Sequence, residues 1–181
     1  MDARRTRLLT SMVAFLVTGC AGTARIAEPE VYNFDCDVPA AKSSEWNRTV
    51  RGNSAKASGT VQLIEPRQDE RWWPVASIFF LGDGDSRRTG LRFMLARENP
   101  NKLQMLVQGP DENAERVTFG EAPWRDGPIP FSVSIDSSGK LTVSAAGNVH
   151  TLQLGKFKIT KFALSCSTAQ FEFADVSVIG N

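Results

Sequence analysis

Residues 130–147, with the sequence PFSVSIDSSGKLTVSAAG, decide the fold of this chain. Apolar and small polar residues alternate there on both sides of a turn-forming segment, 136–140. The apolar positions are Phe131, Val133, Ile135, Leu141 and Val143. Alternation on both sides of a short turn predicts a β-hairpin with one buried face. The other face is expected to be wet or functional, because its side chains are polar: Ser132, Ser134, Thr142 and Ser144.

The same period of two extends outward along the chain in both directions. Val61 and Leu63 share one phase, and so do Leu91 and Phe93. Gly, Pro, Asn and Asp interrupt these runs about every 8–14 residues, and no convincing amphipathic helix follows the first thirty residues. This spacing predicts an all-β fold, with one domain over residues 31–181 built as a single antiparallel two-sheet sandwich of about ten strands.

Some stretches depart from the simple alternation. Residues 72–81 (WWPVASIFFL) are apolar on both faces, which is expected for a central strand or one covered on both sides. That strand should begin after Pro74, because proline cannot donate to a sheet. A change of apolar phase within the last strand predicts a β-bulge near Ala174 and Asp175. Two polar segments are expected to be loops: 42–55 and 110–116.

The N-terminus has the pattern of an export signal. Three arginines within the first seven residues precede an apolar run at 8–17, which is too short to span a bilayer. The run ends in Val17-Thr18-Gly19-Cys20, which resembles the lipobox of bacterial lipoproteins. The alternatives are an ordinary signal peptide with an incidental cysteine and a buried N-terminal segment.

The lipobox resemblance implies a processed and acylated N-terminus. Residues 1–19 would be removed as the signal peptide, and Cys20 would carry a diacylglyceryl group and an N-linked acyl chain such as palmitate. Three acyl chains should anchor firmly, since one alone is marginal. Residues 20–30 would then be the lipidated cysteine and a flexible tether. No aspartate follows the cysteine, so the resemblance favours the outer membrane of the bacterial envelope, facing the periplasm or the surface.

The remaining cysteines are Cys36 and Cys166. Two thiols in an exported protein favour one disulfide, which would hold the first strand beside a late one near residues 162–166. Two unpaired buried cysteines, too far apart to bond, are the alternative.

The hairpin of residues 130–147 and the stretch FEFADV at 171–176 resemble the concanavalin A-like lectin and glucanase sandwich, including laminin-G-type domains. This resemblance implies a jelly roll, in which a first strand meets the last ones. Glycosidases of this superfold use closely spaced carboxylates on one strand. The nearest approaches in this chain are Asp35 with Asp37, Glu28 with Glu30, and Glu172 with Asp175. The first pair has no third carboxylate after it, the second lies in the tether, and the third has an odd spacing, so a hydrolase is the less favoured possibility.

Composition and charge exclude several other classes. The chain has 21 basic and 20 acidic residues, and its formal charge of +1 does not indicate a large nucleic-acid surface. The single histidine, His150, excludes multi-histidine metal chemistry. Because no Gly-x-Ser-x-Gly motif accompanies it, we expect His150 to be a partly buried structural residue.

Two clusters combine a flat aromatic ring with hydrogen-bonding side chains. They are Trp46 with Arg48, and Trp124 with Arg125 and Asp126. Such combinations can bind sugars through ring faces and hydroxyl groups, so these residues are predicted to bind a ligand. Packing in the core or at the rim is the alternative, because tryptophans of sandwich proteins usually serve there.

Two further features concern charge. The turn GDGDS at 82–86 offers Asp83 and Asp85 to a calcium ion, although Asp-Gly is also common hairpin chemistry, and otherwise we expect no cofactor. Four arginines gather around one predicted hairpin: Arg87, Arg88, Arg92 and Arg97. They fit either a solvated face or a patch for an anionic glycan or lipid headgroup.

These features together predict a lipid-anchored bacterial envelope protein that is not an enzyme and whose β-sandwich binds a glycan or another envelope protein. One alternative is a structural accessory subunit of an envelope complex, which would expose an apolar patch, for instance around Trp72 and Trp73. The other is a glycoside hydrolase of the same superfold.

Overall fold

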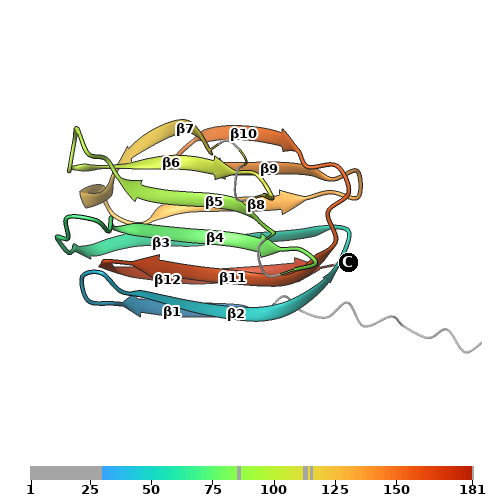
Figure 1. Cartoon of the computed structure of the whole chain (residues 1–181), viewed down its shortest axis with the longest axis horizontal. Helices are drawn as coiled ribbons and strands as arrows, with labels where there is room; N and C mark the ends of the chain where they lie inside the picture. The colour runs from blue at the N-terminus through green and yellow to red at the C-terminus, as the bar shows by residue number, and fades with distance from the viewer. Residues whose placement is uncertain (1–29, 85–86, 112–113, 115, 181) are drawn as a thin grey trace, which may run out of the picture.

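The computed structural model describes residues 30–84, 87–111, 114 and 116–180, and twelve strands within them form two six-stranded sheets (Figure 1). Sheet A consists, in spatial order, of β1 (Val31–Asp37), β12 (Ala169–Gly180), β3 (Ala55–Pro66), β8 (Ile129–Ile135), β9 (Lys140–Ala145) and β10 (Asn148–Gln153). Sheet B consists of β2 (Ser43–Gly52), β11 (Ile159–Ser167), β4 (Val75–Leu81), β5 (Arg88–Leu95), β6 (Lys102–Gln108) and β7 (Arg116–Pro123). All neighbouring strands are antiparallel, so the predicted all-β sandwich is confirmed.

The predicted hairpin forms β8 and β9 in sheet A. Val133 lies opposite Val143, and both side chains are fully buried. Ser132 lies opposite Ser144 on the other, more exposed face. Asp136 begins the turn as its carboxylate accepts hydrogen bonds from the backbone N–H groups of Ser138 and Lys140. The polar and apolar pattern of residues 130–147 is therefore realised as two faces of one hairpin.

The core lies between the two sheets and is built from the inward-facing side chains of both. Its largest fully buried members include five phenylalanines: Phe80, Phe93, Phe162, Phe171 and Phe173. Their strands come from both sheets, so each sheet buries its inner face against the other. The outer face of each sheet is consequently free to carry other side chains.

A disulfide joins the two sheets at one edge of the sandwich. Cys36 lies on β1 of sheet A and Cys166 on β11 of sheet B, with their Cα atoms 6.1 Å apart. The predicted pairing is confirmed. The strands that the disulfide joins, β1 and β11, are not neighbours in one sheet, because β1 pairs with β12. The disulfide therefore links the two sheets across the core.

Two local predictions are also confirmed. The strand β4 begins at Val75, directly after Pro74. The pairing of β12 with β3 shifts register between Ala174 and Ser177, which is the predicted bulge. Asp175 has a φ angle of 53° within it, and its backbone N–H donates a 2.9 Å hydrogen bond to Asn33.

The loop predictions need correction. Residues 42–55 contain the ten-residue strand β2 and the start of β3, and Arg116, at the end of segment 110–116, already begins β7. The edge strand β2 is mostly polar and has only one buried side chain, Val50, so its sequence shows little alternation of apolar and polar residues. A three-residue 3-10 turn, η1 (Trp124–Asp126), also interrupts the strands.

No helix in the described part of the chain is long and apolar enough to cross a membrane. The predicted signal peptide, the acylated Cys20 and all but the last residue of the tether lie outside the described residues.

Candidate functional site

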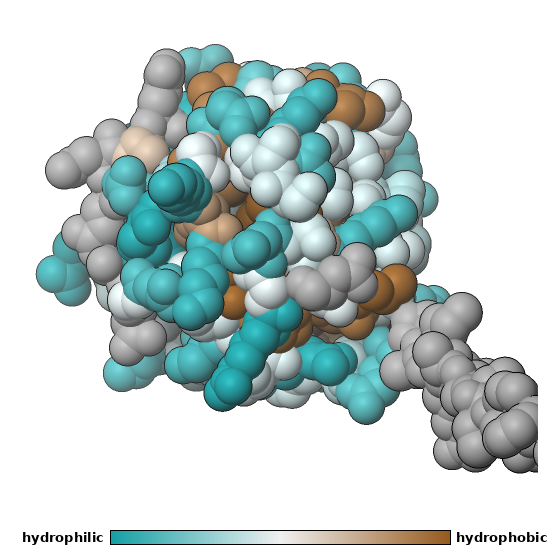
Figure 2. Space-filling model, turned by 90° about the vertical axis from the view of Figure 1, so that its right-hand side faces the viewer, coloured by the Kyte–Doolittle hydropathy of each residue, from teal (hydrophilic) through white to brown (hydrophobic). Residues whose placement is uncertain are grey.

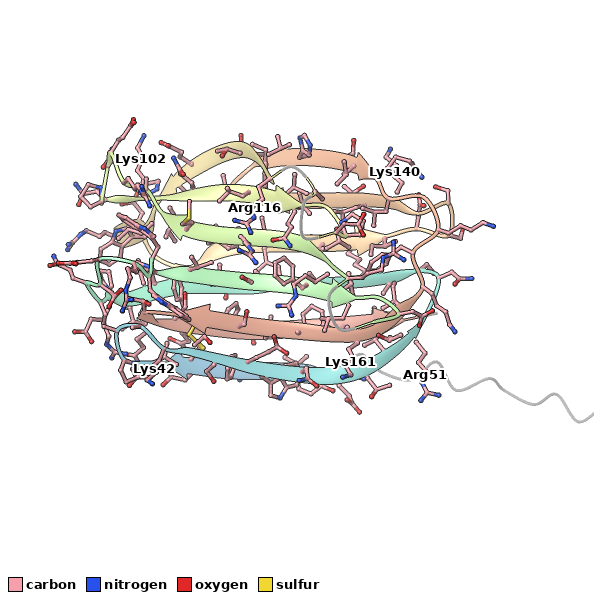
Figure 3. All side chains as sticks on the ribbon, viewed as in Figure 1. Lys42, Arg51, Lys102, Arg116, Lys140 and Lys161 are labelled. Atoms are coloured by element: carbon pink, nitrogen blue, oxygen red, sulfur yellow. A yellow bond between two sulfur atoms is a disulfide. The ribbon has the colours of Figure 1, made fainter. Side chains whose placement is uncertain are left out.

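The outer face of sheet B, which is turned toward the viewer in Figures 1 and 3, carries basic side chains from three strands. Arg88 and Arg92 come from β5, Arg116 from β7 and Lys161 from β11. Figure 3 labels Arg116 and Lys161 on this face. Among the described residues, no carboxylate lies within 4.0 Å of any of the three arginines. The face therefore presents positive charge that has no ion-pair partner in this part of the chain.

A groove of about 400 Å³ crosses this face over β2, β11, β4 and β5. Trp72 and Val75 lie at the end where β4 begins. The polar residues that line the groove include Glu45, Ser77, Arg88, Arg92, Ser165 and Ser167. Ser165 lies opposite Ser77 across β11 and β4, and Ser77 lies opposite Arg92 across β4 and β5. The strand register thus places two hydroxyl groups and a guanidinium side by side.

Arg92 is the most confined of these cations. Its Nε atom is buried and has no hydrogen-bond partner within the described structure. Burial, followed by repulsion from Arg116 and Arg88, lowers the pKa of Arg92 to about 10. The guanidinium remains charged at neutral pH. Burial disfavours this charged form, and a bound anion would stabilise it. Arg92 is therefore the strongest candidate for an anion contact in the groove.

Gln108 on β6 adds a second unsatisfied group to the same face. Its side chain is 5% exposed, and its Oε1 atom has no donor within the described structure. Gln108 lies opposite Gly90 on β5 and opposite Arg116 on β7. Buried polar atoms usually have hydrogen-bond partners. An unpaired acceptor beside an unpaired cation therefore indicates that this face binds a ligand.

The floor of this face is apolar. Phe79, Leu81 and Ala163 form a small buried cluster apart from the main core. Phe79 is only 2% exposed, and the guanidinium carbon of Arg92 lies 5.1 Å from its ring centre. The doubly apolar stretch 72–81 is explained in this way, because β4 is a central strand covered on both faces.

Two residues of the predicted ligand set, Trp46 and Arg48, lie away from the groove. Trp46 packs partly buried at the edge between the sheets, with its ring centre 4.9 Å from that of Tyr32. The guanidinium carbon of Arg48 lies 5.0 Å from the same tyrosine ring, and the side chain forms an ion pair of 3.1 Å with Glu30. Their geometry is that of edge packing, the alternative reading of this pair.

The second predicted set lies at the end of the sandwich where β3 and β7 finish. Trp124 is 8% exposed and donates from Nε1 to the carbonyl of Pro100 at 2.9 Å. The guanidinium carbon of Arg125 lies 4.4 Å from the centre of that indole, whereas Asp126 is exposed. The Trp124 ring therefore belongs mainly to the core, and only its margin and Arg125 line a cavity.

The proposed calcium turn has an unfavourable setting. Asp83 lies at the end of the sandwich that carries the C-terminus, beside a cavity also lined by Arg87, Lys156 and Lys158. Figure 2 shows this end, where hydrophilic side chains gather. Three cations around one carboxylate disfavour a metal ion. Asp85 lies outside the described residues, and within these no group of three metal-ligating side chains is found.

The predicted arginine cluster divides in the structure. Arg88 and Arg92 line the groove, but Arg87 lies 3.6 Å from Asp111 and Arg97 stacks on Trp73 at 4.5 Å. Sequence reasoning missed Arg116, because it is more than twenty residues away along the chain. It also missed the groove residues Ser77, Ser165 and Ser167, whose only signal was their alternation with buried neighbours.

Comparisons with solved structures place the fold among concanavalin A-like jelly-roll proteins. A polysaccharide lyase of family 18 superposes with a TM-score of 0.58 at 9% identity, covering 86% of this chain and 89% of that one. The CBM2 module of the evolved Dit protein of Lactobacillus casei BL23 phage J-1 gives 0.56 at 11% identity, covering 80% and 74%. An alginate lyase from Pseudomonas aeruginosa gives 0.51 at 17% identity, covering 71% of this chain and only 65% of that one.

No protein-family model matches the sequence, and no curated protein matches it either. At these identities the comparisons show the fold alone. The jelly-roll prediction is thereby confirmed. The prediction that the chain is not an enzyme needs correction, because polysaccharide lyases have this same fold and the fold therefore gives no ground for excluding catalysis.

Proposed function

We propose that the groove on sheet B binds an anionic polysaccharide, with carboxylate or sulfate groups held by Arg92 and Arg88 in the groove and by Arg116 beside it on the same face. The observation that carries this proposal is the Nε atom of Arg92, which is buried on this face and has no hydrogen-bond partner in the described structure. Burial and two neighbouring arginines also lower the pKa of Arg92. Three guanidinium groups without carboxylate partners in the described chain repel one another unless an anion lies between them. Arginine also matches the planar carboxylate of a uronic acid through paired hydrogen bonds.

The neutral part of the groove suits the rest of a sugar. Ser77 and Ser165 offer hydroxyl groups that both donate and accept hydrogen bonds. Ser167 offers an acceptor, because its hydroxyl already donates to the carbonyl of Trp73, and Glu45 accepts as well. Trp72 offers an aromatic ring at one end. A ligand with many hydroxyl groups and regularly spaced anions uses all of these at once, whereas a simple inorganic anion uses only the arginines.

The comparisons support this class of ligand. Two of the proteins that share the fold are lyases whose names give alginate or polysaccharide as their substrate, and a third is a carbohydrate-binding module. Alginate is a polymer of uronic acids, so its charge is complementary to the face described above. The groove supplies one carboxylate among its described lining residues, Glu45, while the common glycosidase mechanism uses two.

The test is a calorimetric titration of the protein with alginate and, separately, with a neutral β-glucan. Alginate should bind, and Arg92→Gln should weaken binding about 10- to 100-fold, the range expected for hydrogen bonds to a charged group. Lys56→Gln removes an exposed charge from the outer face of sheet A and should leave affinity unchanged. The ultraviolet absorbance of an unsaturated uronate product, followed in the same samples, reports cleavage by elimination.

Two results would contradict the proposal. One is equal affinity for the neutral glucan, since the arginines would then contribute nothing. The other is an Arg92→Gln protein that binds alginate as the wild type does.

We further propose that Cys20 is acylated and tethers this domain to a bacterial envelope membrane. The strand register supports such an arrangement, because Val31 begins β1 opposite Ser177, near the end of β12 and the end marked C in Figure 1. Trp72 lies just before β4, at the other end of the sandwich, since Val75 pairs with Ser167 at the end of β11. A tether entering at Val31 would leave the groove accessible. Metabolic labelling with a palmitate analogue should mark the wild-type protein and not Cys20→Ser.

A further inference from the structure

A second cavity adjoins the groove at the end of the sandwich where β4 begins. This end pocket has a volume of about 610 Å³, is open to solvent, and is lined by residues within 66–74, the end of β5, the connection between β5 and β6, and η1. Trp72 lines both the groove and the end pocket. The two cavities therefore share one lining residue, Trp72.

Trp72 is unusually exposed for its size. It is 44% exposed, whereas Trp124 in the same end pocket is 8% exposed, and Trp73 is half-buried under Arg97. A large, solvent-exposed aromatic ring that lines two cavities offers a flat surface to a ligand.

The backbone around Trp72 is fixed by hydrogen bonds on both sides. Asp69 accepts the N–H groups of Arg71 and Trp72 through Oδ1, each at 2.9 Å, and these two bonds lower the pKa of Asp69. Ser167 donates from Oγ to the carbonyl of Trp73 at 2.9 Å. The segment before β4 is thus attached to β11, and the backbone that carries Trp72 is ordered before any ligand arrives.

We propose that the groove and the end pocket form one continuous cleft for a single polysaccharide chain, with Trp72 stacking on a sugar ring at their junction. This inference rests on the binding function proposed above and adds the length of its ligand. Volumes of about 400 and 610 Å³ each suit one small ligand, so a monosaccharide fills only part of the cleft. An extended oligosaccharide occupies both cavities, with its charged groups at Arg92 and Arg88 and a distal segment near Arg125.

The cleft predicts a dependence on chain length that a separate groove would not show. Affinity should rise as alginate oligomers lengthen beyond those that fill the groove. Arg92→Gln should weaken binding at every length. Trp72→Ala should leave the shortest oligomers unaffected and remove the gain shown by longer ones, a loss on the order of tenfold.

The experiment measures the dissociation constants of a size-fractionated series of alginate oligomers by calorimetry. It compares the wild type, Trp72→Ala and Ile64→Ala, which truncates an exposed apolar side chain of β3 in sheet A. Affinity for the shortest oligomer that binds serves as the folding control. The Asp69→Ala protein should behave like Trp72→Ala, whereas Asp69→Asn, which keeps an oxygen acceptor, should behave like the wild type.

The results separate this inference from the proposed function. A Trp72→Ala protein that keeps the full gain with length would overturn the continuous cleft while leaving the groove intact. So would a wild-type protein that shows no gain. If no oligomer binds at all, the polysaccharide function itself fails, and the cleft fails with it.

Discussion

The guanidinium carbon of Arg92 lies 5.1 Å from the centre of the Phe79 ring, and both side chains belong to the outer face of sheet B. The contact shields the ring, which is only 2% exposed although it faces away from the main core. Arg92 also lies opposite Ser77 in the register of β5 with β4. The buried Phe79 ring contributes to the stability of this face, and Arg92, which lies over the ring, contributes to its positive charge.

Replacing Phe79 with alanine should weaken both properties. Loss of a buried phenylalanine typically lowers the free energy of unfolding by about 3–5 kcal/mol. The cation would also lose the ring over which it lies, so affinity for alginate should fall. Urea unfolding and calorimetry measure the two effects. Phe79→Leu keeps most of the apolar volume and should be milder in unfolding, and a Phe79→Ala protein as stable as the wild type would contradict this account.

Gly90 is required beside this pair. A Cβ atom at this position would lie 2.1 Å from the carbonyl oxygen of Ile78 and 3.0 Å from the Phe79 ring, and its φ angle is 151°. Gly90→Ala should therefore lower the free energy of unfolding by more than the roughly 1–3 kcal/mol of backbone strain alone. Gly127→Ala is the matched control, because φ is also positive there at 116° but no atom lies within 4 Å. Equal destabilisation of the two variants in urea would refute the steric argument.

Local patterns in the sequence were sufficient for much of the fold. The hairpin of residues 130–147 contains both of its strands and its turn in one short segment, so periodicity alone predicts it. The bulge near Asp175 and the start of β4 after Pro74 are equally local. The edge strand β2 was missed because only Val50 is buried along it.

The candidate site was less accessible to sequence reasoning, because it depends on which strands are neighbours. Arg92 could be recognised on the polar phase of its strand. Its proximity to Ser165 follows from β4 lying between β5 and β11, a pairing between segments about eighty residues apart. The polar residues that follow Trp124 in the sequence favour it as a ligand-binding ring, yet Trp124 is buried, whereas Trp72, which has no such signal, is exposed.

Removal of the disulfide should destabilise the sandwich strongly. The bond between Cys36 and Cys166 closes a loop with a sequence separation of 130, which in the chain-entropy description contributes about 4–5 kcal/mol. The double variant Cys36→Ala with Cys166→Ala should unfold at a correspondingly lower guanidinium concentration than the oxidised wild type. Reductant should shift the wild type toward the variant and leave the variant unchanged. A wild-type midpoint that does not respond to full reduction would contradict the prediction.

The hairpin turn should lose stability in acid through Asp136. Its pKa is lowered, first by the hydrogen bond from the Ser138 hydroxyl at 2.6 Å and then by the Lys140 N–H. Because the folded state has the lower pKa, the carboxylate stabilises the fold above the pKa of the unfolded chain, and that contribution disappears as pH falls through the folded value. The difference in unfolding free energy between the wild type and Asp136→Ala should therefore shrink below about pH 4.

Asp136→Asn provides the control for this titration. Its amide oxygen can still accept from the backbone N–H of Ser138, but it carries no charge that changes with pH. The difference in stability between Asp136→Asn and Asp136→Ala should stay constant across the same acidic range in urea titrations. If the wild type and Asp136→Ala keep a constant difference as well, the acid sensitivity of the fold must come from other carboxylates.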